Sequence, residues 1–335
     1  SRDEKELAAC YEILKAIRTR IGDEYQYKRE SMLFELFQNA DDAVVELGVL
    51  FDSSGRNHRQ ENKQGLSDDH RKVVVDWDDT RIRFAHWGRG INQIHPGNGE
   101  RYGYGSDLVK MLTMLRSDKR IAPELDVAPL TGKFGLGFKS VYLVTNQPSI
   151  ISGRLKFRIS SGLYPARLSN DEVLELSSVL SGWSLGENQG GTLIDLPFDK
   201  QILTASNIKE LVQSFYRWAH LLITFTHEIN QIDLLHKGIR QHSIHWDPQR
   251  VSEDLDWYVG RLYAYQSDEP IIALIWRYGS KDTDTQGNIL IEIQPVGCVP
   301  LAVDTPKLWV TVPTQDQLPI KFALNGLFAL DIGRA

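Results

Sequence analysis

Three polar residues recur within a short segment of the sequence at a spacing suited to acid–base and metal chemistry. Glu35, Asn39 and Asp42 stand in the run Glu-Leu-Phe-Gln-Asn-Ala-Asp-Asp-Ala over 35–43. On a helix with 3.6 residues per turn these positions fall within roughly 60° of one another. A carboxylate can orient or deprotonate a water, and an amide oxygen can ligate Mg²⁺. The spacing therefore predicts one chemically active helix face.

The other side of the same helix is apolar. Its residues are Leu33, Leu36, Ala40, Val44 and Leu47. An amphipathic helix with one hydrated side explains this pattern without any chemistry, and the motif taken alone favours that simpler explanation. The interpretation therefore depends on the segments that follow it.

Three glycine-containing segments follow in order. Residues 84–92 run from an apolar strand into a Gly-x-Gly turn, and residues 190–198 lead from two glycines into another apolar strand. Between them, residues 131–142 form a glycine-rich turn that opens a helix, whose N-terminal amides and dipole can hold phosphate. One glycine turn is weak evidence because ordinary turns need glycine. The order and spacing of all four segments carry the signal.

Hydrophobic periodicity predicts the elements that position these segments. We expect the first fifty residues to be helical, with a second helix over 28–47. Further helices are expected over 107–116 and 207–226, and strands over 73–75, 81–85, 149–151, 156–159, 192–196, 257–265, 271–278 and 289–296. The polar segment 52–72 predicts a solvated loop or disordered insert. Frequent glycines around the helix near 107 predict a mobile lid over 91–131.

Composition describes an ordinary soluble protein. Of the 335 residues, 41% are apolar and 24% charged, and a chain of this length predicts two domains. A net charge of −6 disfavours nucleic acid as the main partner, and two cysteines, Cys10 and Cys298, favour a reducing, cytoplasmic location. No apolar run reaches the roughly 18–20 residues of a membrane helix. Because the chain stops directly after an apolar stretch, we expect a fragment of a longer protein.

The four segments together resemble the nucleotide-binding boxes of the GHKL superfamily, which includes gyrase B, ninety-kilodalton heat-shock chaperones, sensor histidine kinases and MutL. The matching patterns are Glu35-x-x-x-Asn39-x-x-Asp42-Ala43, His86-x-Gly88-x-Gly90, Gly132-x-Phe134-Gly135-x-Gly137-Phe138-x-Ser140 and Gly191-Thr192. They span about 28–198. Residues 138–145, 148–150, 152–153 and 325–330 resemble sacsin-type proteins more specifically. No phosphoacceptor helix of a histidine kinase is apparent.

This resemblance implies an architecture. It is an α/β sandwich, the Bergerat fold, in which helices pack on one face of a mixed, mostly antiparallel sheet. Residues 1–200 would form the nucleotide-binding ATPase domain. Residues 201–335 would form a truncated second domain of α+β type, similar to the middle or transducer domain of these proteins.

The resemblance also implies ligands and roles. ATP and Mg²⁺ would be the cofactors, with Glu35 as the base that activates water and Asn39 as the Mg²⁺ ligand. Arg334 would contact the γ-phosphate from the second domain. The implied nucleotide contacts are Asn39, Asp42, Ala43, His86, Gly88, Gly90, Ile91, Lys119, Gly132, Lys133, Phe134, Gly135, Leu136, Gly137, Phe138 and Thr192. For Lys119 an ordinary surface lysine, and for His86 a histidine packed at a strand end, are the structural alternatives.

One residue departs from the family pattern. The second box normally begins with an aspartate that accepts a hydrogen bond from the adenine amino group, and here that residue is His86. A neutral imidazole has one acceptor nitrogen and carries no negative charge. Adenine bound through that nitrogen, a different base, a water-mediated contact and a pocket without nucleotide therefore all stay open.

The leading functional hypothesis is an ATPase in which Mg-ATP closes the lid and moves the second domain, with slow hydrolysis resetting it. A sensor or scaffold that does not hydrolyse nucleotide is the second hypothesis, motivated by His86. A DNA-processing ATPase of MutL or gyrase type is the third, and the acidic balance disfavours it. Protein partners or clients and a homodimer are expected from the family, and a membrane is not.

Overall fold

A computed structural model describes most of the chain. The described residues are 2–24, 28–55, 66–94, 102–113, 137–184, 190–199, 204–250, 257–264, 271–278, 287–294, 297–299, 301, 304–310, 312–314 and 318–326. The helices are α1 (Arg2–Thr19), η1 (Arg20–Glu24), α2 (Ser31–Gly55), η2 (Asp68–Arg71), η4 (Tyr104–Ser106), α3 (Asp107–Leu112), η5 (Phe138–Leu143), α4 (Asn170–Trp183), α5 (Ala205–Leu222) and η6 (Ile223–Phe225).

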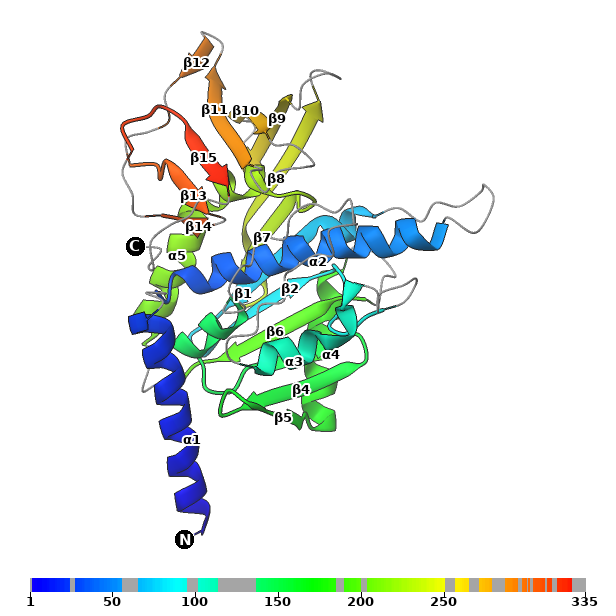
Figure 1. Cartoon of the computed structure of the whole chain (residues 1–335), viewed down its shortest axis with the longest axis vertical. Helices are drawn as coiled ribbons and strands as arrows, with labels where there is room; N and C mark the ends of the chain where they lie inside the picture. Colours follow the sequence, from blue (N-terminus) through cyan, green and yellow to red (C-terminus); the bar gives the residue numbers. More distant parts are fainter. Residues whose placement is uncertain are drawn as a thin grey trace.

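The strands join into one hydrogen-bonded sheet (Figure 1). They are β1 (Lys72–Trp77), β2 (Arg81–His86), β3 (Ser149–Ser152), β4 (Leu155–Ser160), β5 (Tyr164–Arg167), β6 (Thr192–Pro197), β7 (Gln231–His236), β8 (Ile239–Arg250), β9 (Trp257–Ala264), β10 (Ile271–Tyr278), β11 (Gly287–Gln294), β12 (Gly297–Val299), β13 (Leu308–Val310), β14 (Val312–Pro313) and β15 (Ala323–Gly326).

Strand order confirms the predicted mixed, mostly antiparallel sheet. The order is β5-β4-β3-β6-β2-β1-β7-β8-β9-β10-β11-β15-β13-β14, with β12 beside β11. Among the described strands only β1–β7 and β13–β15 pair in parallel. The twelve-residue β8 pairs with β7 on one side and β9 on the other, so it links the two halves of the sheet.

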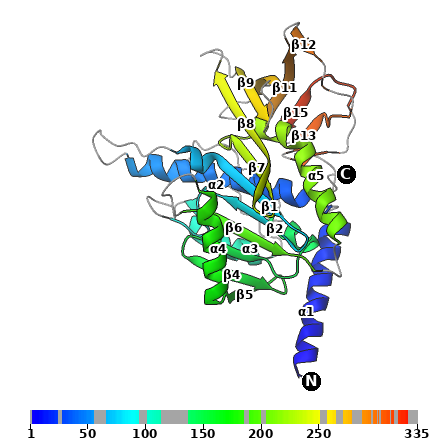
Figure 2. The same cartoon turned by 180° about the vertical axis from the view of Figure 1, so that it is seen from behind.

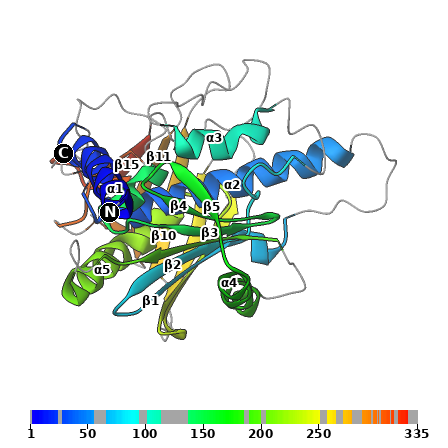
Figure 3. The ribbon, with the colours of Figure 1, turned by 90° about the horizontal axis from the view of Figure 1, so that it is seen from below.

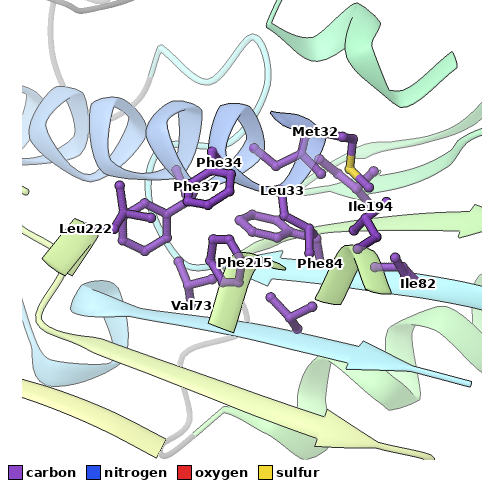
Figure 4. Packing of buried hydrophobic residues seen from close by; sticks show 14 of the residues in the cluster. Met32, Leu33, Phe34, Phe37, Val73, Ile82, Phe84, Ile194, Phe215 and Leu222 are labelled. Carbon is purple, nitrogen blue, oxygen red and sulfur yellow. The ribbon is translucent and has the colours of Figure 1, made fainter. Parts of the chain in front are cut away.

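The main core lies between α2 and one face of the sheet. Successive side chains of a strand point to opposite faces, so Val73 and Val75 of β1 join Ile82 and Phe84 of β2 on the α2 side. Buried side chains of α2, α5 and β6 complete the cluster that Figure 4 shows. Because the apolar side of α2 packs on the sheet, the polar side that carries Glu35 and Asn39 is turned away from this core.

The prediction that helices cover one face only is wrong. Helix α4 packs on the face opposite α2 (Figure 3), where Leu176 and Leu180 join Ala85 and Leu193 in a second cluster. This helix was not predicted, and Ser169 with Glu172 forms a capping box at its start. Both faces of the sheet are therefore covered near β2 and β6.

The residues after 200 contribute to the first core. Phe215 of α5 lies 5.2 Å from Phe34 of α2 between ring centroids, and β7 pairs with β1 (Figure 2). The same compact core therefore extends to β7. The domain boundary near residue 200 stays a prediction.

Several predicted elements differ in their ends. The hairpin across Asp78 and Asp79 is confirmed, with Trp77 opposite Ile82. Helix α2 continues to Gly55 and η2 occupies Asp68–Arg71, so the predicted loop over 52–72 is wrong at both ends. Helix α3 ends at Leu112, and residues 114–116 lie outside the described part of the chain. Strand β5, at the edge of the sheet, was missed.

Candidate functional site

The polar side of α2 carries the first group of candidate residues. Glu35 and Asp42 are buried, at 4% and 7% exposure, and Asn39 is half-buried. Leu36 and Ala40, from the apolar side of the helix, lie in the main core. The face predicted from spacing alone therefore exists, and other segments cover it from solvent.

Gly137 of the third glycine-rich segment lies against this face. A Cβ atom placed at residue 137 would be 2.7 Å from Glu35 Oε2 and 3.4 Å from Asn39 Nδ2. Only glycine allows the main chain to come so close to both side chains. The predicted catalytic and metal-binding residues thus lie beside the segment predicted to contact phosphate.

Gly88, in the second glycine segment, packs on α2 at Ala43, which is further along the helix than Glu35 and Asn39. A Cβ at residue 88 would lie 2.6 Å from the backbone of Ala43, and the Arg89 amide donates to the Ala43 carbonyl oxygen at 2.8 Å. Eight residues of helix separate Glu35 from Ala43, which corresponds to a rise of roughly 12 Å. The second and third glycine-rich segments therefore contact α2 at two separate places along the helix.

A row of polar residues crosses the sheet on the α2 side. His86 of β2 is opposite Thr192 of β6, and Thr192 is opposite Ser152 of β3. The Thr192 and Ser152 hydroxyl oxygens are 2.7 Å apart, and Ser152 Oγ accepts from the Ile91 amide at 2.8 Å. This row brings residues of the second and fourth boxes together, and Ser152 is a member that sequence reasoning missed.

His86 is neutral and its acceptor nitrogen is engaged. It is 7% exposed, and the Gly88 amide donates to its Nδ1 at 3.2 Å. Burial, with a smaller contribution from the charge of Arg89, lowers the pKa of His86 to about 4. With Nδ1 accepting, the ring proton sits on Nε2. The hydrogen bond that the sequence suggested for adenine at His86 would thus need a nitrogen already used by Gly88.

Arg89 of the second box connects α2 to α3. Its guanidinium contacts Glu46 of α2 at 2.6 Å and Asp107 of α3 at 2.6 Å, and lies 4.0 Å from the Tyr104 ring centroid. Burial opposes the charge of Arg89, but Glu46 and Asp107 outweigh it and raise its pKa. A buried arginine shared by two carboxylates therefore fixes the start of α3.

Lys139 of the third box fixes the other end of α3. Its side chain is 1% exposed, and Nζ donates to the carbonyl oxygens of Thr113 at 2.7 Å and Met111 at 3.1 Å. Burial lowers the pKa of Lys139 to about 8. Helix α3 is therefore held at both ends by residues of two glycine-rich segments, Arg89 and Lys139, and neither contact is evident from sequence spacing.

The adjacent aspartates on α2 have different surroundings. Asp41 accepts from the backbone amides of His227, Glu228 and Ile229 at 2.8–3.0 Å. These bonds fasten α2 to the segment before β7, which is a structural role. Asp42 is also buried, and its place at a nucleotide stays a prediction.

Some of the remaining predicted site residues are described by the structure, and the others are not. Gly90 lies near Gln93 and Ser152, and Ile91 and Phe138 pack against the edge of the core. Seven predicted residues fall outside the described part of the chain: Lys119, Gly132, Lys133, Phe134, Gly135, Leu136 and Arg334. For these the predicted roles stay predictions.

The described residues contain no group of three or more His, Cys, Asp or Glu arranged to hold a metal ion. Mg²⁺ on a nucleotide needs only one or two protein oxygens beside phosphates and waters, so the Asn39 amide next to Glu35 fits such a site. In the same residues, no helix combines the length and apolar character of a membrane span.

Comparisons with known proteins give one partial likeness. The chain is 34% identical over 112 residues to Protein NO VEIN of Arabidopsis thaliana, a match that covers 30% of this chain and 4% of that protein. No protein-family model matches the chain. Because the likeness spans so little of the larger protein, it shows no family for this chain.

Proposed function

We propose that this chain binds a nucleoside triphosphate with Mg²⁺ on the polar side of α2 and hydrolyses it slowly. The observation that supports this most is the approach of Gly137 to Glu35 and Asn39. It brings a carboxylate and a carboxamide against the main chain of one glycine. Because the four segments resemble the GHKL nucleotide-binding boxes, we interpret this arrangement as a nucleotide site.

Each residue has a role in this proposal. Glu35 orients a water and takes its proton, and its burial keeps that carboxylate apart from bulk solvent. Asn39 holds Mg²⁺, which when bound offsets the charge of the phosphates. Thr192 and His86 contact the base from the sheet, at the end of the site near Ala43.

Lid movement belongs to the same proposal. Arg89 and Lys139 anchor α3 to the second and third glycine-rich segments. Nucleotide that orders these segments would also order α3, which is how binding would be coupled to a change of shape. The contacts of α3 support this proposal for the described part of the segment, and a lid over the whole of 91–131 stays a prediction.

The sensor without hydrolysis is a second candidate. The engaged acceptor nitrogen of His86 favours it, because the usual recognition of adenine is disturbed. Glu35 separates the two candidates experimentally, because hydrolysis depends on this carboxylate and binding does not.

The experiment that tests the proposal is phosphate release by the 335-residue chain with ATP, GTP, inosine triphosphate or cytidine triphosphate and Mg²⁺. We expect slow release with at least one nucleotide, abolished in Glu35→Gln. The matched control Glu210→Gln changes an exposed glutamate of α5 and should retain the rate. Thermal shifts should persist in Glu35→Gln and weaken in Asn39→Ala. A nucleotide-dependent shift without phosphate release supports the sensor, and no shift with any nucleotide contradicts both candidates.

A further inference from the structure

His86 presents an unpaired donor at the base end of the candidate site. It lies at the end of β2 on the α2 side, next to Thr192, and is more than nine-tenths buried. Its Nδ1 accepts from the Gly88 amide, so its Nε2 carries the proton. Within the described residues Nε2–H has no hydrogen-bond partner. Nε2 is not among the fully buried unpaired side-chain atoms of the described residues, so it is open to solvent and an acceptor on a ligand can take the place of water there.

The tautomer is fixed by the turn that follows the strand. Gly88 is held against the backbone of Ala43, and the Arg89 amide bonds to the Ala43 carbonyl. The Gly88 amide therefore cannot turn away from His86 without moving this part of the turn off α2. Arg89 next to the site also disfavours a positive charge on the imidazole. His86 thus offers one N–H donor and no free acceptor.

Nucleotide bases differ in what they offer to such a donor. Adenine carries an amino group at position six, which is itself a donor and cannot pair with Nε2–H. Guanine and hypoxanthine carry a carbonyl oxygen at position six, which accepts. The neighbouring Thr192 hydroxyl can donate or accept, so it does not decide between these bases. His86 is therefore the residue that distinguishes between these bases.

We propose that His86 makes this site selective for purine nucleotides with a carbonyl oxygen at position six, such as guanosine and inosine triphosphates, over ATP. This inference rests on the proposed nucleotide site. Sites that pair a polar group of the ligand reject analogues that leave a buried group unpaired, often by large factors. His86 is then the residue that determines specificity, through the proton on Nε2.

The test compares dissociation constants of GTP, inosine triphosphate and ATP with Mg²⁺ for the wild-type chain and two variants. In the wild type we expect GTP and inosine triphosphate to bind at least about tenfold more tightly than ATP. His86→Asp should reverse this order, because one carboxylate oxygen accepts from Gly88 and the other accepts from the adenine amino group. His86→Asn should keep the wild-type order, because its oxygen accepts from Gly88 and its amide nitrogen donates like Nε2.

The outcomes separate this inference from the proposed function. If ATP binds the wild type as tightly as GTP and inosine triphosphate, for instance through its acceptor nitrogen N1, the base selectivity is wrong and the nucleotide site stands. If none of the three folded proteins binds any of these nucleotides, the nucleotide site itself is wrong. If His86→Asp does not fold, the wild-type order and the matching order in His86→Asn still decide the inference.

Discussion

Glu35 and Gly137 meet so closely that a methyl group at residue 137 would lie 2.7 Å from Glu35 Oε2. These residues come from α2 and from the third glycine-rich segment. Their contact fixes where the carboxylate sits relative to the main chain that we propose for phosphate binding. A side chain at residue 137 must therefore displace the carboxylate or the main chain.

The first prediction concerns Gly137→Ala. The nearest obstacle is the flexible end of the Glu35 side chain, so the free energy of unfolding should fall by only about 1 kcal/mol. Phosphate release should fall by roughly a hundredfold, because small displacements of a reacting group have effects of that size.

Gly182→Ala on α4 is the matched control for this change. Residue 182 has open space around it and no left-handed backbone, so alanine should raise stability by about 0.5–1 kcal/mol and leave phosphate release unchanged. A Gly137→Ala protein that releases phosphate at the wild-type rate would contradict the assigned position of Glu35.

The second prediction concerns Gly88→Ala. Here the added methyl group would lie 2.6 Å from backbone atoms of Ala43 and Val44, which cannot rotate away as a side chain does. We expect a loss of about 3 kcal/mol in the free energy of unfolding. Denaturation by urea should show a larger decrease in midpoint for Gly88→Ala than for Gly137→Ala, and equal midpoints would argue against the close packing of this turn on α2.

Local sequence patterns predicted much of the sheet but not all of the helices that pack on it. Strands β1 and β2 alternate apolar residues between two buried faces, and the turn at Asp78 and Asp79 separates them clearly. Helix α4 was missed although Ser169 and Glu172 provide a capping-box signal that could have found it. Strand β5 is short and mostly exposed, so it has little hydrophobic pattern to detect.

The candidate site was predictable where its residues share one element. Glu35, Asn39 and Asp42 follow from helical spacing, yet spacing does not show that Asp41 instead binds the amides before β7. The tautomer of His86 depends on the Gly88 amide folding back onto Nδ1. This contact is set by the three-dimensional turn, which the residue types alone do not specify.

The third prediction concerns Arg89→Met. The change leaves Glu46 and Asp107 largely buried without their shared cation, which should lower the free energy of unfolding by about 3 kcal/mol. Amides of α3 should exchange hydrogen faster, because the helix loses its anchor at Asp107. Mass spectrometry after deuterium exchange measures this directly.

Two further variants sharpen the Arg89 test. Adding Glu46→Gln and Asp107→Asn to Arg89→Met removes the unpaired charges and should recover part of the lost stability. Arg217→Met breaks an exposed ion pair with Asp304 and should leave the unfolding midpoint unchanged. Unaltered exchange in α3 of Arg89→Met would show that Arg89 does not anchor the lid helix.

The fourth prediction concerns pH and His86. Burial first, and the Arg89 charge second, lower its pKa from 6.5 to about 4 in the folded chain. Between these values the unfolded chain binds a proton at His86 and the folded chain does not, so stability falls as pH decreases. The contribution of His86 to the free energy of unfolding is complete above pH 6.5 and lost near pH 4, and its full size is on the order of 3 kcal/mol.

Urea unfolding of wild type and His86→Asn from pH 7.5 to 4 isolates the contribution of His86, because both proteins share all other titrating groups. The stability difference between them should shift against the wild type by that amount, and parallel curves would mean that His86 is not buried as a neutral ring.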